Sequence, residues 1–247
     1  MRLLILLVLT FGIACSSSAQ TLDELISKSI VARGGIERLK SVKSLRMTGH
    51  ISLGPNAAGL LIFEAKRPGK VREELQLEDK LIVRTSDGVS GWSLNPFSEK
   101  TGPEPLSAEE MSNMEQKADI DHPIVDYKQK GYRVELLGKD TVEDHVVYKL
   151  KVTLKNDQIR YDYLDANTGL SLKWEGKIVS GGKEINAQSY FTDYRDVEGR
   201  KYPFHVDSSS EGSDIKQTIV FDKIEINPAI DDSRFGKPTA PETTPKP

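Results

Sequence analysis

Alternation of apolar and polar positions is the dominant pattern between residues 59 and 97. Apolar side chains such as Leu61 and Phe63 fall at every second position, and charged side chains occupy most of the positions that follow. Turn-forming residues at 67–70 and 86–88 divide the stretch into strand-like runs, because Pro and Gly adopt the backbone angles of tight turns. Side chains of a strand alternate between its two faces. The pattern therefore predicts an antiparallel meander with one apolar face and one charged face.

The second half of the chain, from residue 127 to 226, repeats the strand pattern. Its clearest run places Tyr148, Leu150 and Val152 on one parity and mostly lysines on the other. Parallel α/β folds need crossovers of about a dozen residues or more, and the tight turns of this chain exclude them. We expect a mainly β fold, an open and strongly curved antiparallel sheet of about ten to eleven strands with helices in its mouth.

The N-terminal part shows helical periodicity. Apolar side chains from Leu22 to Ile30 recur at i, i+3, i+4 and i+8, which predicts a helix with a single apolar stripe in residues 21–44. Gly34-Gly35 ends this helix, since Gly adopts the left-handed conformation of a helix cap. A shorter helix over 36–41 continues the stripe.

A further helix is predicted over residues 107–119. Ser107 and Glu110 have the spacing of a capping box. Met111 and Met114 lie on one side, and methionine adapts to irregular apolar partners. The pattern leaves two interpretations open: a helix packed permanently on the sheet edge, or a movable lid.

Alternate strand positions predict a concave apolar surface. One slip in register would reverse which parity faces inward. The candidates for this lining are Leu61, Phe63, Val71, Leu75, Trp92, Tyr148, Leu150, Val152 and Trp174.

The two ends of the chain differ from the predicted domain, residues 20–236. Residues 1–19 have a short apolar run ending in Ser17-Ser18-Ala19, which is typical of a signal peptide cleaved before Gln20. Export to the periplasm is the first interpretation. The alternative is a lipoprotein anchored through Cys15. Residues 237–247 are rich in Pro and Thr and predict a disordered tail.

Charge and composition narrow the function classes. The formal net charge of −3 argues against nucleic acid, whose phosphates need a basic surface. The single cysteine precedes the domain, so no internal disulfide, thiol nucleophile or cysteine-based metal site is expected. Residues 119–123 combine two Asp with His122, but no further ligand follows at a defined spacing, and we expect no metal. No catalytic motif is present; we expect a protein that is not an enzyme and has no cofactor, with a periplasmic hydrolase as the weaker alternative.

An ordered set of residues resembles a known family. Gly59, Lys66-Arg67-Pro68, Asp87-Gly88, Trp92 and Asn95-Pro96-Phe97 are similar to the LolA/LolB-like periplasmic carriers that sort outer-membrane lipoproteins. Further matches, such as Thr168-Gly169-Leu170 and Tyr202-Pro203, extend the resemblance over about residues 30–236. The resemblance implies a half-barrel with a helical lid over its concave face. The chain departs from the family at Val71 and Glu73, where large aromatic residues are frequent.

The resemblance also implies a function. A monomeric carrier of this family binds the acyl chains of lipoproteins or lipids in the half-barrel and delivers them towards the outer membrane. Its partners would be an ABC-type release complex at the inner membrane and an acceptor at the outer membrane. The alternative is an envelope sensor or regulator of the same fold.

The resemblance gives one residue a specific role. Arg67 matches the family arginine that latches the lid through backbone carbonyls, here of the helix near Met111 or of the loop after Gly34. The alternative for Arg67 is an ordinary surface residue.

Overall fold

The computed structural model describes residues 20–55, 57–100, 102–180 and 182–239. Within them the chain forms one antiparallel sheet of 13 strands in the order β6-β5-β4-β3-β2-β1-β13-β12-β11-β10-β9-β8-β7. The strands are β1 (Ser44–Leu53), β2 (Ala58–Lys66), β3 (Lys70–Leu77), β4 (Lys80–Ser86), β5 (Gly91–Leu94), β6 (Glu104–Pro105), β7 (Arg133–Val142), β8 (His145–Thr153), β9 (Ile159–Asp165), β10 (Ser171–Ser180), β11 (Lys183–Val197), β12 (Arg200–Ser210) and β13 (Gln217–Ile226). The mainly β, open antiparallel fold is confirmed, but the predicted number of strands was too low.

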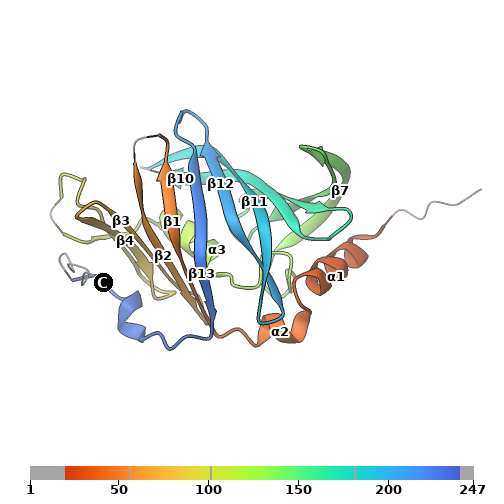
Figure 1. Ribbon diagram of the computed structural model, residues 1–247, viewed down its shortest axis with the longest axis horizontal. Coiled ribbons are helices and arrows are strands. Elements are labelled where there is room, and N and C mark those ends of the chain that lie inside the picture. Colours follow the sequence, from red (N-terminus) through yellow and green to blue (C-terminus); the bar gives the residue numbers. More distant parts are fainter. Residues whose placement is uncertain (1–19, 56, 101, 181, 240–247) are drawn as a thin grey trace, which may run out of the picture.

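The pairing of β1 with β13 joins the two halves of the sheet, and every other pair of neighbours is consecutive in the chain. Gly49 marks a register shift in this pairing. A Cβ atom at Gly49 would overlap the backbone of Val220 and Phe221, so the close approach of the two strands requires glycine at this position. The sheet curves around helix α3, which lies behind β13 and β12 in the view of Figure 1.

Three α-helices complete the described fold: α1 (Leu22–Ala32), α2 (Ile36–Lys40) and α3 (Ala108–Ala118). Both predicted helical regions are therefore present. Thr21 and Glu24 form a capping box at the start of α1, and Ser107 and Glu110 form the predicted one at the start of α3. The stripe of α1 packs through Ile26 against the apolar side chains of β7, β8 and β9. Among the described residues no helix is long and apolar enough to cross a membrane.

The C-terminal segment covers the face of the sheet that α3 does not contact. A 3-10 helix, η1 (Asp232–Phe235), follows β13 and packs on β3 and β4. Phe235 is fully buried. Arg234 donates to Glu64 at 2.6 Å and to Glu74 at 2.7 Å. The predicted charged face of the meander is thus partly an internal ionic layer.

The predicted ends of the domain lie partly outside the described residues. Residues 1–19, with Cys15, and residues 240–247 are among those not described. At the start of the predicted tail, Lys237 lies over the ring of Trp92 and Pro238 is buried. The segment after η1 thus brings Lys237 against β5.

Candidate functional site

The inner face of the sheet, which we define as the face that packs against α3, carries most of the predicted cavity residues. Met114 and Ala118 of α3 pack on Val71, with Phe63 beside them. Residues paired directly across an antiparallel ladder share a face. Because Ala65 pairs with Val71, and Leu61 with Leu75, these positions of β2 and β3 share the inner face.

The same face continues into the second half of the sheet. Leu150 pairs with Asp162, which pairs in turn with Trp174. Tyr148, Leu150 and Val152 alternate along β8, and the latter two pack beneath α1. These predicted residues therefore lie on the inner face, although α1 already covers Leu150 and Val152.

Trp92 lies on the opposite face, contrary to the prediction. It pairs with Thr85, whose hydroxyl group reaches the carbonyl oxygen of Arg234 in η1. The preceding Gly91 takes the inner position. A Cβ atom there would overlap the sulfur atom of Met111, so the approach of α3 leaves no room for a large side chain at this end of β5.

The centre of the inner face is an apolar floor that periodicity alone did not single out. Its buried members, from β1, β12 and β13, are Leu45, Met47, Tyr202, Phe204, Phe221 and Ile224. Leu61 and Phe63 pack against this cluster, which links it to the contact with α3. The apolar floor therefore extends from the strands at the middle of the sheet towards the region beneath α3.

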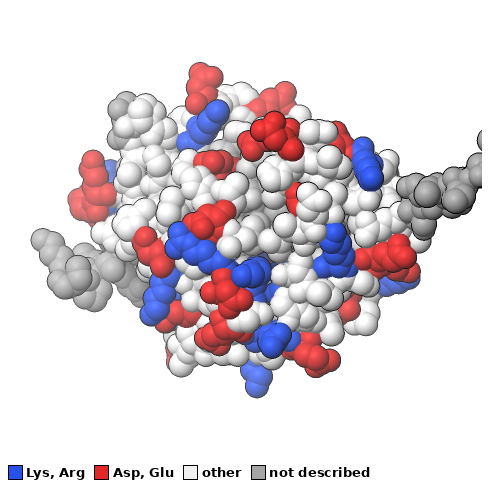
Figure 2. Space-filling model, turned by 45° about the vertical axis from the view of Figure 1, so that its right-hand side comes forward, with Lys and Arg blue, Asp and Glu red and all other residues white. Residues whose placement is uncertain are grey.

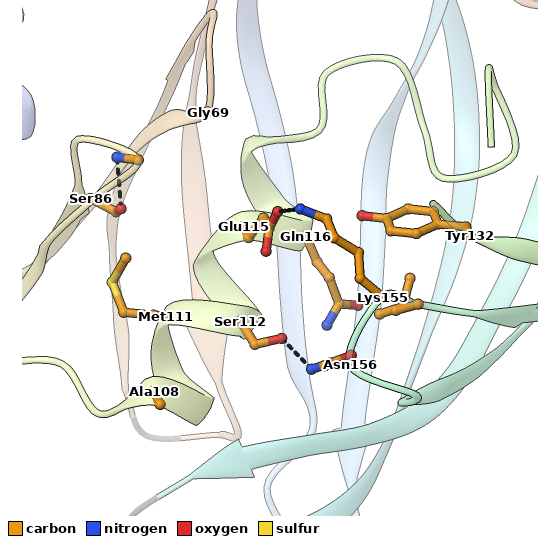
Figure 3. Close-up of a pocket in the computed structure, with 12 residues that line it drawn as sticks. Gly69, Ser86, Ala108, Met111, Ser112, Glu115, Gln116, Tyr132, Lys155 and Asn156 are labelled. Atoms are coloured by element: carbon orange, nitrogen blue, oxygen red, sulfur yellow. Dashed lines mark hydrogen bonds and ion pairs between the residues drawn. The ribbon is translucent and has the colours of Figure 1, made fainter. Parts of the chain in front are cut away.

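Helix α3 also makes polar contacts at its surface, beside the buried side chains of Met114 and Ala118. Lys117 forms an ion pair with Glu73 of β3 at 2.7 Å. On its other side, Ser112 accepts a hydrogen bond from Asn156 at 2.8 Å, and Glu115 pairs with Lys155 (Figure 3). Exposed ion pairs contribute only about 0–1 kcal/mol each. Glu73 of β3 is thus a contact with α3.

A cleft of about 450 Å³ opens beside α3. The turns after β2 and β4 line one wall through Gly69 and Gly88, and Tyr132 and Leu154 line the opposite wall. Met111 of α3 projects towards the turn side of the cleft (Figure 3). Acidic and basic side chains are intermixed on the molecular face of Figure 2, so that face presents no single-sign patch to a ligand.

Arg67 contacts a backbone carbonyl group in the segment after Gly34, one of the two expected places, and also a carboxylate that was not expected. Its Nε donates to the carbonyl oxygen of Val42 at 2.7 Å, and its Nη2 pairs with Asp121 at 2.5 Å. Val42 follows α2, and Asp121 follows α3, so neither partner is a carbonyl group of α3. Lys40 also pairs with Asp121, at 2.9 Å. Burial raises the pKa of Asp121, but the hydrogen bonds from Arg67 and Lys40 outweigh it and hold the pKa below its usual value.

His122 next to this ion pair is predicted to make folding sensitive to pH. Burial and the nearby charges of Arg33, Arg160 and Lys130 hold its pKa well below 6.5. Below about pH 6.5 the unfolded chain binds a proton at His122 that the folded protein does not bind. Each unit by which the pH falls therefore lowers the free energy of unfolding by about 1.4 kcal/mol, until the pH reaches the pKa of His122 in the folded protein.

Urea unfolding between about pH 7.5 and about pH 5 measures this slope. The His122→Gln variant should show a flatter slope than the wild type. His50→Gln is the control, because the side chain of His50 is 69% exposed, and it should keep the full slope. Equal slopes for both variants would assign the pH dependence to other groups.

The comparisons with known proteins find a similarity in fold but none in sequence. No protein-family model matches the chain, and no curated protein matches it in sequence. A DUF1329 family protein from Desulfovibrio piger is 10% identical, with 87% of this chain and 96% of that chain covered and a TM-score of 0.59. A LolA superfamily protein from Nitrosomonas europaea is 14% identical, with 89% of this chain and 99% of that chain covered and a TM-score of 0.56.

A third solved structure is a domain classed as an outer membrane lipoprotein-sorting protein, from Vibrio parahaemolyticus. It is 10% identical, with 86% of this chain and 94% of that chain covered, and has a TM-score of 0.55. Identities this low carry the fold and not the activity. The open antiparallel sheet, with α3 against its inner face, is a LolA/LolB-like fold.

Proposed function

We propose that this protein is a periplasmic carrier that binds acyl chains of lipoproteins or lipids on the inner face of the sheet and delivers them towards the outer membrane. The observation that carries the proposal is the apolar floor, whose edge at Phe63 lies against α3, and α3 is held there by a small apolar contact and by exposed polar ones. When α3 moves away, the side chains of Phe63 and Val71 become available to an acyl chain.

The energetics favour exchange between α3 and an acyl chain. Each buried CH₂ group contributes about 0.8 kcal/mol, so a 16-carbon chain gains on the order of 10 kcal/mol before entropic costs. Displacing α3 exposes Met114 and Ala118 and breaks surface ion pairs of about 0–1 kcal/mol each. The closed helix therefore competes with the ligand, which keeps binding reversible.

The first test is binding and transfer of a defined acylated probe. The full chain with Cys15 replaced by Ser is mixed with a fluorescent 16-carbon fatty acid, and separately with a synthetic diacylated lipopeptide. We expect saturable binding of both, and release of the bound lipopeptide to acceptor vesicles that is faster than its release from a control albumin. Failure to bind either probe contradicts the carrier proposal, and binding without transfer favours the envelope sensor.

Delivery implies partners at both membranes. We propose an inner-membrane ABC-type complex as the source of acylated cargo and an outer-membrane protein as its acceptor, with the carrier acting as a monomer. Intact mass of the exported protein distinguishes a chain that begins at Gln20 from one lipidated at Cys15. A diacylglyceryl adduct on Cys15 would place the protein on a membrane and overturn the soluble carrier.

A further inference from the structure

The interior of the protein contains polar atoms that the apolar floor does not explain. In the part of the chain that the structure describes, the buried side-chain atoms without a hydrogen-bond partner are Nδ1 of His122, Nε of Arg160, Oδ2 of Asp162, Oγ of Ser171 and Oδ1 of Asn113. All of them belong to α3, to the segment after it, or to β9 and β10. Buried polar groups are nearly always hydrogen-bonded. Arg160 and Asp162 form an ion pair, and the charge of Arg160 acts on His122, so three of these atoms belong to neighbouring side chains and indicate a site for a polar partner.

Asp162 is the most enclosed member of this group. Its side chain is 0% exposed, and its pairing with Leu150 and Trp174 places it on the inner face. One carboxylate oxygen accepts from Nη2 of Arg160 at 2.5 Å, whereas Oδ2 has no partner among the described residues. A buried carboxylate requires donors for both oxygens. Oδ2 is therefore an open acceptor inside the protein.

Arg160 provides positive charge beside this acceptor, and Arg33 lies in the same neighbourhood, because the charges of both arginines act on His122. The guanidinium group of Arg160 lies over the ring of Trp174 at 5.1 Å, and its buried Nε–H has no partner among the described residues. The side chain of Arg33 donates to the carbonyl oxygen of Asp121 at 2.6 Å, and no carboxylate in the described part of the chain pairs with it. The set therefore combines donors for an anion with one acceptor for a cation.

The position of Arg160 connects the set to the cleft. Arg160 pairs with Val152 across the β8–β9 ladder, two residues from Leu154, which lines the cleft. Its charge also acts on the hydroxyl group of Tyr132, another residue of the cleft wall. A ligand that enters beside α3 would thus meet Arg160 before it reaches Asp162.

We propose that Arg33, Arg160 and Asp162 form a headgroup site for a phospholipid that carries both a phosphate and a primary ammonium group. The phosphate accepts from Nε of Arg160 and from Arg33, and the ammonium group donates to Oδ2 of Asp162. The apolar floor next to the site takes the acyl chains. This inference rests on the proposed function, because the headgroup reaches the site when α3 moves away from the floor.

Short-chain lipids test the headgroup preference on the intact protein. In a Trp92→Phe background, the fluorescence of Trp174 reports binding of dihexanoyl phosphatidylethanolamine, phosphatidylcholine and phosphatidylglycerol. Phosphatidylcholine keeps the phosphate but has no N–H donor, and phosphatidylglycerol has no ammonium group. We expect phosphatidylethanolamine to bind about tenfold more tightly than either, which corresponds to one charge-assisted hydrogen bond. Equal affinities for the three lipids would overturn the inference.

Two variants assign the preference to the site. Asp162→Asn should bind phosphatidylethanolamine and phosphatidylcholine equally. Glu175→Gln is the matched control, because Glu175 lies next to Trp174 in β10 on the opposite face, paired with Lys173 at 2.7 Å; it should keep the preference. If Asp162→Asn does not fold, the comparison of the three lipids on the wild-type protein still tests the headgroup preference.

The remaining outcomes separate this inference from the proposed function. Tight binding of free phosphoethanolamine, equal to that of the lipid, would identify a soluble ligand and overturn the lipid headgroup. Binding of the fatty acid without any headgroup preference would leave the acyl carrier standing and show that the polar set holds only water. If the wild-type protein does not bind the fatty acid, that result would contradict the proposed function itself.

Discussion

Replacing Asp121 by alanine is expected to lower the free energy of unfolding by about 3 kcal/mol. The carboxylate is 2% exposed and pairs with both Arg67 and Lys40. Removing one partner of a buried ion pair costs about 3–5 kcal/mol because the remaining charge loses its partner. The lower end applies here, since the two cations are 34% and 39% exposed and water can reach them.

Urea unfolding near neutral pH measures this change as a shift of the midpoint. Asp232→Ala is the matched control, because Asp232 also pairs with two cations, Lys66 and Lys70, but is 61% exposed. The midpoint of the control should stay where it is in the wild type. Equal midpoint shifts for the two variants would show that Asp121 is no more important than a surface carboxylate.

The same contacts revise what we expect from Arg67. Its hydrogen bond to Val42 and its ion pair with Asp121 join the end of β2 to the segments after α2 and α3. The sequence suggested a latch on a carbonyl group of the lid helix or of the loop after Gly34, or else a surface residue. The bond to Val42 is a carbonyl contact in the segment after Gly34, and the structure adds a buried carboxylate, 54 residues from Arg67 in the chain. Neighbouring residues carry no signal of such a distant partner, and Asp121 on its own resembled a candidate metal ligand.

Strand periodicity predicted which residues lie at the centre of the inner face, but it failed at the edge of the sheet, in β5 and β6. Leu61, Phe63 and Leu75 share a face because tight turns between their strands keep the register. Trp92 falls on the other face, because the chain between β4 and β5 determines which residue of β5 points inward. β6 has two residues, too few to show any period, which is one reason why the predicted number of strands was too low.

The covering of the opposite face was not predictable from local pattern. Glu64 and Glu74 alternate with apolar residues, which is also the pattern of a solvated strand face. In the structure Glu64 is 1% exposed and accepts from Arg46 and Arg234. Arg234 lies 170 residues from Glu64, in a Pro-rich region without periodicity. An isolated Phe235 there gave no sign that it would be fully buried.

The proposed role of α3 can be tested by fixing the helix in its closed position. In a Cys15→Ser background, Glu73→Cys and Lys117→Cys replace an ion pair of 2.7 Å between β3 and α3, and a bis-maleimide with an internal disulfide joins the two thiols. We expect the cross-linked protein to bind the fluorescent fatty acid at least about 100-fold more weakly than the uncross-linked variant. The reason is that the closed helix keeps the chain from the floor around Phe63, and each lost CH₂ contact costs about 0.8 kcal/mol.

The control places the same cross-link where it cannot restrain α3. Lys177 and Glu184 form a comparable ion pair of 2.9 Å within the β10–β11 hairpin, so their double cysteine variant should bind the fatty acid normally when cross-linked. Cleaving the linker with a reductant should restore binding to the Glu73→Cys, Lys117→Cys variant. Undiminished binding by that variant while it is cross-linked would mean that the acyl chain enters without movement of α3, through the cleft between Met111 and Tyr132.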